Sequence, residues 1–111
     1  MASFIEFEEI ALSFPEVSVE PHFEKISFRV KKKIFATYDE KNHRVTVKLS
    51  VSDQELYSLT GPSVYPVDNN WGKQGWTFIE LGEIDRELLK KVLTSSFCEV
   101  APKTLSDLIK N

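Results

Sequence analysis

The side chains of this chain that could do chemistry are mostly cations, and they gather in one stretch. Residues 25–48 hold eight bases and two acids, whereas residues 1–24 hold six acids and neither Lys nor Arg. Clustered positive charge suits a polyanion, because each phosphate that a protein neutralises releases counterions, and basic β-ribbons fit nucleic-acid grooves. The candidate phosphate contacts are therefore Lys31, Lys32, Lys33, Lys41, Arg44 and Lys48, with Lys73 from a later loop.

The same charges also have a purely structural explanation. Lysines at hairpin turns and strand edges prevent sheet-to-sheet aggregation, and the acidic first segment is able to pair with the basic one inside the fold. The whole chain carries a net charge of −3, whereas nucleic-acid-binding domains are usually basic overall. The charge pattern alone therefore leaves binding and internal pairing open.

Two tryptophans form the second candidate site. Trp71 and Trp76 flank Gly72 and Gly75, and glycine allows close backbone approach. Indole rings in such a loop could stack on bases or hold the apolar side chain of a peptide. Alternatively, both rings cover the open side of the sheet with only their N–H groups at an edge.

No pattern of catalytic or metal-ligating residues stands out. His22 and His43 are the only histidines, Cys98 is the one cysteine, and the four glycines form no phosphate-binding motif. We expect loop imidazoles at both histidines and a small core residue at Cys98. The sequence therefore predicts a non-enzymatic protein without metal or cofactor. In an enzyme, His22 would be the first catalytic candidate, in a cleft beside residues 16–25.

These candidates need a scaffold, which the hydrophobic periodicity outlines. A first helix is predicted from Ser3, whose spacing to Glu6 fits a capping box, up to Pro15, which disfavours helical geometry in the residue before it. Its apolar positions recur at steps of three and four residues. We interpret residues 16–25 as a connecting loop.

Three strands are predicted next, at residues 26–30, 34–38 and 44–49, because apolar and polar residues alternate there with a period of two. Their short connections imply an antiparallel meander. In the third strand Arg44 and Lys48 share one face.

The remaining elements follow from turn and cap signals. A second helix is predicted from a capping box at Ser52 to Gly61. A long loop follows at residues 62–75, with a short strand near its start, and then a strand at residues 76–81. Asp85 should cap a third helix. Its apolar stripe is Leu88, Leu89, Val92, Leu93 and Phe97, and a last helical piece should begin after a cap at Thr104.

This order indicates one α+β domain over residues 1–111, an antiparallel sheet with helices on one face. No segment is apolar over the length of a membrane span, and the acidic start lacks the features of a signal peptide. A single cysteine excludes an internal disulfide and suits a reducing cytosol. We therefore expect a cytoplasmic protein that needs no membrane.

Six short motifs occur in order along the chain: Pro21-His22-Phe23, Ser27-Phe28-Arg29-Val30, Lys33-Ile34-Phe35-Ala36, Val47-Lys48-Leu49-Ser50, Trp71-Gly72-Lys73-Gln74-Gly75-Trp76 and Ala101-Pro102-Lys103. Together they resemble the MmcQ/YjbR family of small bacterial proteins over nearly the whole chain. The resemblance implies a CyaY-like, secretion-chaperone-like fold, α-β(3)-α-β(2)-α. It also implies DNA binding through a "double wing", which here would be the turns at residues 31–33 and 39–44.

Two hypotheses of different classes follow. In the first, a non-enzymatic DNA-binding module contacts phosphates through its basic meander, assisted by Trp71 and Trp76. In the second, a chaperone-like module binds a protein or peptide through its exposed sheet face and the same tryptophan loop. The oligomeric state stays open in both.

Overall fold

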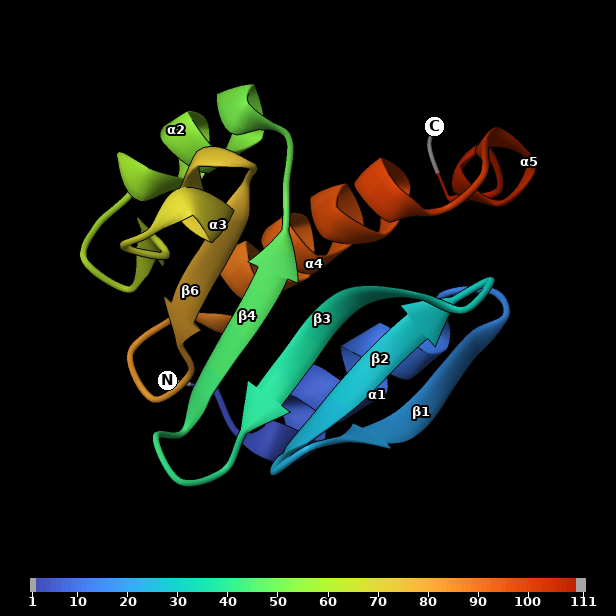
Figure 1. Cartoon of the computed structure of the whole chain (residues 1–111), viewed down its shortest axis with the longest axis horizontal. Coiled ribbons are helices and arrows are strands. Elements are labelled where there is room, and N and C mark those ends of the chain that lie inside the picture. The colour runs from blue at the N-terminus through green and yellow to red at the C-terminus, as the bar shows by residue number, and fades with distance from the viewer. Residues whose placement is uncertain (1, 110–111) are drawn as a thin grey trace.

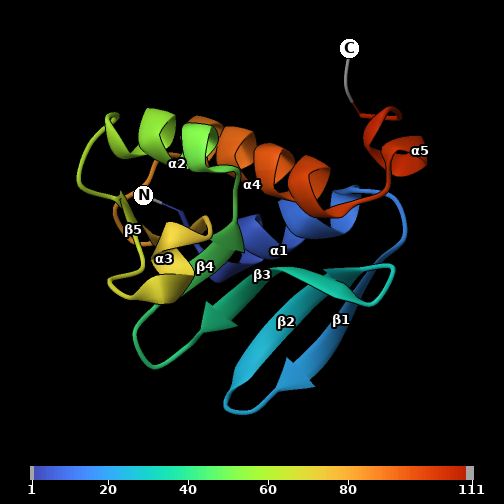
Figure 2. The same cartoon turned by 45° about the horizontal axis from the view of Figure 1, so that its top comes forward.

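An antiparallel sheet of six strands organises the fold. The computed structural model describes residues 2–109. The strands are β1 (Val17–His22), β2 (Lys25–Val30), β3 (Lys33–Asp39), β4 (Arg44–Lys48), β5 (Val64–Pro66) and β6 (Trp76–Glu80), and the helices are α1 (Phe4–Ser13), α2 (Val51–Ser58), α3 (Asn70–Lys73), α4 (Arg86–Val100) and α5 (Lys103–Ser106). The strand order is β1-β2-β3-β4-β6-β5. Helices α1, α2 and α4 lie on one side of this sheet (Figure 1, Figure 2), which confirms the expected α+β class.

Local signals define the two helices that cover most of the core. Ser3 accepts the backbone N–H of Glu6, and the Glu6 carboxylate accepts the N–H of Ser3, as the predicted capping box requires. Helix α1 ends at Ser13, shortly before Pro15. The carboxylate of Asp85 caps α4, also as predicted.

Aromatic rings fill the space between these helices and the sheet. The rings of Phe7 and Phe28 meet edge to face at 5.0 Å. Phe97 of α4 contacts Phe35 at 5.6 Å and Phe14 at 4.9 Å. All five are buried, and burying a large apolar side chain contributes about 1.5–3 kcal/mol. This core therefore holds α1 and α4 against the middle of the sheet.

A β-bulge in β3 lets two consecutive residues of this strand face the core. Phe28 pairs with Ala36, but Arg29 pairs with Ile34, so Phe35 is an additional residue on β3. Phe35 and Ala36 are consequently both buried in the core, while Arg29 and Ile34 remain on the opposite face.

The interpretation of residues 16–25 as a loop is wrong, because most of them form β1. This strand pairs with β2 along its whole length. Its polar residues and Pro21 hide the strand pattern, and an edge strand tolerates both because only one of its sides must pair. The sheet therefore has one strand more than expected.

Three further boundaries differ from the prediction. Ser50 rather than Ser52 caps α2, since its extended backbone follows directly on β4. The loop at residues 62–75 contains the short helix α3 besides the expected strand β5. Pro102 rather than Thr104 occupies the cap position of α5, without a side-chain hydrogen bond.

Candidate binding site on the open sheet face

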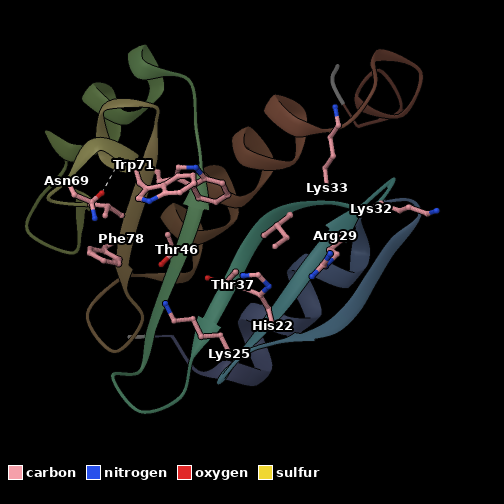
Figure 3. A pocket seen from close by; sticks show the side chains of 13 residues that line it. His22, Lys25, Arg29, Lys32, Lys33, Thr37, Thr46, Asn69, Trp71 and Phe78 are labelled. Carbon is pink, nitrogen blue, oxygen red and sulfur yellow. Dashed lines mark hydrogen bonds between the residues drawn. The ribbon is translucent and has the colours of Figure 1, made fainter.

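The face of the sheet opposite the helices is hollowed. Val45 and Val47 of β4 are buried beneath the helices, so Thr46 between them points the other way. Thr46 and Thr37 lie at the bottom of a hollow of about 770 Å³ (Figure 3). This volume is within the range of ordinary ligand sites.

One wall of the hollow is aromatic. It consists of Trp71 from α3 and of Trp76 and Phe78 from β6 (Figure 3). Trp71 is 59% exposed, and the other two are half-buried. Of the two interpretations of the tryptophan loop, the one in which the rings cover the sheet with only their N–H groups at an edge therefore does not describe Trp71, whose ring is largely open to solvent. Flat ring faces beside a hollow are suited to stacking on a planar ligand.

Buried Gln54 of α2 fixes this aromatic wall. Its side-chain nitrogen lies 2.9 Å from the carbonyl oxygen of Gly72, 3.1 Å from that of Trp76 and 3.1 Å from Oγ1 of Thr77. The Thr77 hydroxyl in turn donates to the carbonyl of Gly75 at 2.9 Å. Because a buried carbonyl left without a donor costs about 1–3 kcal/mol, these contacts tie α3 to β6.

The two glycines of the segment lie where no side chain would fit. A Cβ on Gly72 would lie 1.7 Å from the carbonyl oxygen of Val67, and one on Gly75 would lie 1.9 Å from that of Leu49. Gly75 also has a φ of +107°, in the region that favours glycine. The backbone between the tryptophans is therefore closely confined, which lowers the entropy lost when a ligand binds.

The opposite wall of the hollow is cationic. It consists of Lys25 and Arg29 from β2 and His22 from β1 (Figure 3). The Nε of Arg29 donates to Oγ of Ser27 at 3.0 Å, and a carboxylate oxygen of Glu20 lies 4.0 Å from the same nitrogen. These contacts hold the guanidinium against the sheet, while Lys25 is exposed.

The three predicted lysines at the β2–β3 hairpin, two in its turn and Lys33 at the start of β3, differ in their surroundings. Lys32 and Lys33 are exposed and lie at the rim of the hollow. The ammonium of Lys31 instead contacts the carboxylate of Glu16 at 2.7 Å. The pairing between the acidic and basic segments that the sequence left open thus occurs at Lys31, and more loosely at Arg29.

Arg44 does not line the hollow but lies beside the aromatic wall, next to Phe78. Its guanidinium lies 4.0 Å from the centre of the Phe78 ring and 4.0 Å from Glu80. Tyr65 donates a short hydrogen bond to Glu80 and lies 3.5 Å from Arg44. Burial raises the pKa of the Tyr65 phenol, and the bond to Glu80 adds to this effect. Glu80 therefore balances the charge of Arg44.

The other three predicted cations do not line the hollow. The ammonium of Lys48 lies 3.6 Å from Glu99 of α4, so it reaches toward a helix. Lys41 is exposed in the β3–β4 turn, and Lys73 is exposed on α3. Lys41 and Lys73 are therefore open to solvent, whereas Lys48 is half-buried and also donates to the carbonyl of Leu49.

The two turns proposed as wings lie at opposite ends of the sheet. The turn at residues 31–32 precedes β3 and the turn at residues 40–43 follows it. With about 3.4 Å per residue, the seven residues of β3 separate the two turns by roughly 20 Å. The turns therefore do not form one adjoining pair.

Two groups of site residues were not predicted. Lys25 and Arg29 belong to the basic stretch, but their position beside His22 depends on β1, which the sequence did not reveal. Gln54 carried no signal at all, because a glutamine in a short helix looks like an ordinary surface residue.

The part of the chain that the structure describes contains no group of three or more His, Cys, Asp or Glu side chains placed to hold a metal ion. Among residues 2–109, no helix has the length and apolar character that a bilayer crossing needs.

Comparison with known proteins identifies relatives of this architecture. The crystal structure of Deinococcus radiodurans protein DR2400, described with the family-model domain DUF419, is similar with a TM-score of 0.78 and 22% sequence identity. The similarity covers 97% of this chain and 88% of that one, and at this identity it establishes the fold alone. No curated protein matches the chain. The model of the YjbR family matches residues 12–99, which confirms the resemblance seen in the six motifs. The chain therefore belongs to the YjbR family.

Proposed function

We propose that this protein binds single-stranded nucleic acid on the open face of its sheet, without catalysing a reaction. The observation that carries this proposal is the pairing of two walls in one hollow. Lys25 and Arg29 lie on one side, and Trp71 and Trp76 on the other. A nucleic-acid strand offers both complements, because its phosphates are anionic and its bases are flat.

The geometry favours a single strand over a duplex. In a duplex the faces of the bases are stacked on each other, so an aromatic wall would have nothing to stack on, whereas unpaired bases are available. The separation of the two basic turns also argues against adjacent wings on one duplex groove. Phosphate contacts from the meander remain part of the proposal, through Lys25, Arg29, Lys32 and Lys33.

Binding of this kind should be weak and salt-dependent. For a single strand, log K falls with log salt concentration at about 0.7 per neutralised phosphate. Four phosphates at the four cations of the hollow would give a slope near −3.

A peptide with acidic and aromatic side chains is the competing ligand. The exposure of Trp71 favours it, since exposed tryptophans often anchor protein partners. This ligand would also contact both walls, but it would lack bases that stack in succession.

Fluorescence anisotropy tests the proposal with a labelled thymidine oligomer of about 12 nucleotides, the matching duplex, and a labelled glutamate–tyrosine copolymer. We expect the single strand to bind best at about 50 mM salt and to bind far more weakly at about 200 mM. Trp71→Ala should weaken binding about tenfold or more. Stronger duplex binding would favour the wing interpretation, and binding of the copolymer alone would favour the peptide; either result would reject the proposal.

A further inference from the structure

The turn between β1 and β2 exposes an aromatic ring at one end of the hollow. Phe23 is 95% exposed, more than Trp71 at 59% or Leu59, the C-cap residue of α2, at 85%. Water around an apolar ring is unfavourable, so a ring this exposed is available to cover part of a ligand.

The backbone at Phe23 is unusual for a bulky residue. β1 ends at His22 and β2 begins at Lys25, which leaves Phe23 and Glu24 as a two-residue turn. Phe23 has a φ of +60°, where a hairpin of this length normally places glycine, asparagine or aspartate. Strained residues of this kind are concentrated at functional sites. The ring makes an edge contact with His22 at 4.9 Å.

The neighbours of Phe23 connect it to the binding hollow. His22 and Lys25 flank the turn in sequence, and both line the cationic wall (Figure 3). A second, smaller hollow of about 410 Å³ is lined by Phe23 and Glu24 together with His22 and Lys25, so it shares two residues with the first hollow and adjoins it at the turn. The aromatic wall lies across the sheet on β6 and α3, separated from β2 by β3 and β4.

We propose that Phe23 is a further base-stacking residue, and that a bound strand runs across the sheet from Trp71, past Lys25, to the β1–β2 turn. This inference rests on the proposed function. Lys25 beside the turn and Arg29 further along the wall favour a polyanion over an apolar protein partner, because an apolar partner would have to desolvate them, while the Glu24 carboxylate next to Phe23 offsets part of this charge.

The test uses Phe23→Gly, which removes the ring and suits the observed φ. The substitution should leave the unfolding temperature nearly unchanged, because the relief of strain offsets the larger unfolded-state entropy of glycine. Leu59→Ser is the matched control, since it removes a similarly exposed apolar side chain at the C-terminal end of α2. Thymidine oligomers of about 12 and about three nucleotides are compared by competition anisotropy over a range of salt concentrations.

We expect Phe23→Gly to weaken binding of the longer oligomer about tenfold and to leave binding of the shorter one unchanged. Its salt slope should equal that of the wild type, because no charge is lost, and Phe23→Trp should restore the affinity. An unchanged affinity for the longer oligomer, or an equal loss in Leu59→Ser, overturns the role of Phe23 while wild-type binding still stands. If the wild type binds neither oligomer, the proposed function fails and this inference fails with it.

Discussion

The two walls of the hollow are held in place by different forces. On the aromatic side, a buried amide and two glycines without room for a Cβ confine the backbone. On the cationic side, the charged groups extend from strands near the edge of the sheet, and exposed carboxylates lie beside Lys31 and Arg29. The positions of the rings therefore depend on packing, whereas the strength of the positive field depends on nearby acids and on salt.

This contrast explains why the sequence reveals the basic residues but not their arrangement. Charge is visible in composition, but the neutralising partners of Lys31, Arg44 and Lys48 come from β1, β6 and α4 or their flanks. Of the cations on the hollow, Arg29 has the carboxylate of Glu20 at 4.0 Å, whereas no ion pair is found for Lys25, Lys32 or Lys33 among the described residues.

The strongest way to break the aromatic wall is to add one methyl group at Gly72. We expect Gly72→Ala to lower the free energy of unfolding by about 3 kcal/mol, because the Cβ would overlap the backbone of Val67. Gly82→Ala is the matched control, since its Cβ would lie 3.4 Å from a ring carbon of His43, and it should cost less than about 1 kcal/mol. Urea unfolding measures both, and equal costs would show that the confinement of Gly72 is not rigid.

A substitution at Gln54 tests whether this residue sets the position of the tryptophan rings in addition to stabilising the fold. Gln54→Leu should cost about 2 kcal/mol, because it leaves the carbonyls of Gly72 and Trp76 without their donor. Ser96→Ala, which removes a buried bond of 2.7 Å to the carbonyl of Phe35, should cost a similar amount. Only Gln54→Leu should increase the quenching of tryptophan fluorescence by acrylamide. Equal quenching in both variants would contradict a local role for Gln54.

The cationic wall is tested by reversing charge. Lys25→Glu combined with Lys32→Glu should abolish most nucleic-acid binding and reduce the salt slope by about 1.4, the share of two phosphates. Stability should change by less than about 0.5 kcal/mol, since both side chains are exposed.

The control for this pair is Lys90→Glu with Lys91→Glu, which changes the net charge equally on the exposed side of α4. If this control weakens binding as much, the overall field of the protein and not the hollow attracts the strand.

The smallest expected effect concerns α1, the helix that supports β1 and β2 from below. The bond from the Ser3 backbone, together with Arg86, lowers the pKa of Glu6 in the folded state. A carboxyl group whose pKa is lower in the folded than in the unfolded state stabilises the fold at pH values above its unfolded pKa, near 4.3. This contribution disappears as the pH falls through the pKa of the folded state. Glu6→Gln should therefore unfold at a lower temperature than the wild type at pH 7 and at nearly the same temperature near pH 2. A constant difference at all pH values would assign the effect to packing instead of charge.

The sequence by itself determined the parts of the fold that depend on neighbouring residues. The capping box of α1, the Asp85 cap of α4, the apolar stripes of both helices, the alternation along β2, β3 and β4, and the short turns between these strands all act within a few residues. The class of the fold followed from their order. The edge strand β1 was not predicted. It is paired on one side only and therefore tolerates polar residues and Pro21, which show no hydrophobic alternation.

Only the tertiary structure decided which of the candidate residues share a site. The meander sends its two basic turns to opposite ends of β3, and the bulge at Phe35 places Ile34 of β3 opposite Arg29 on the open face. Trp71 lies across the sheet from Lys25 because β4 pairs with β6, a contact between segments about thirty residues apart. Such pairings depend on burial and hydrogen bonding between distant segments, and no local pattern in the sequence encodes them.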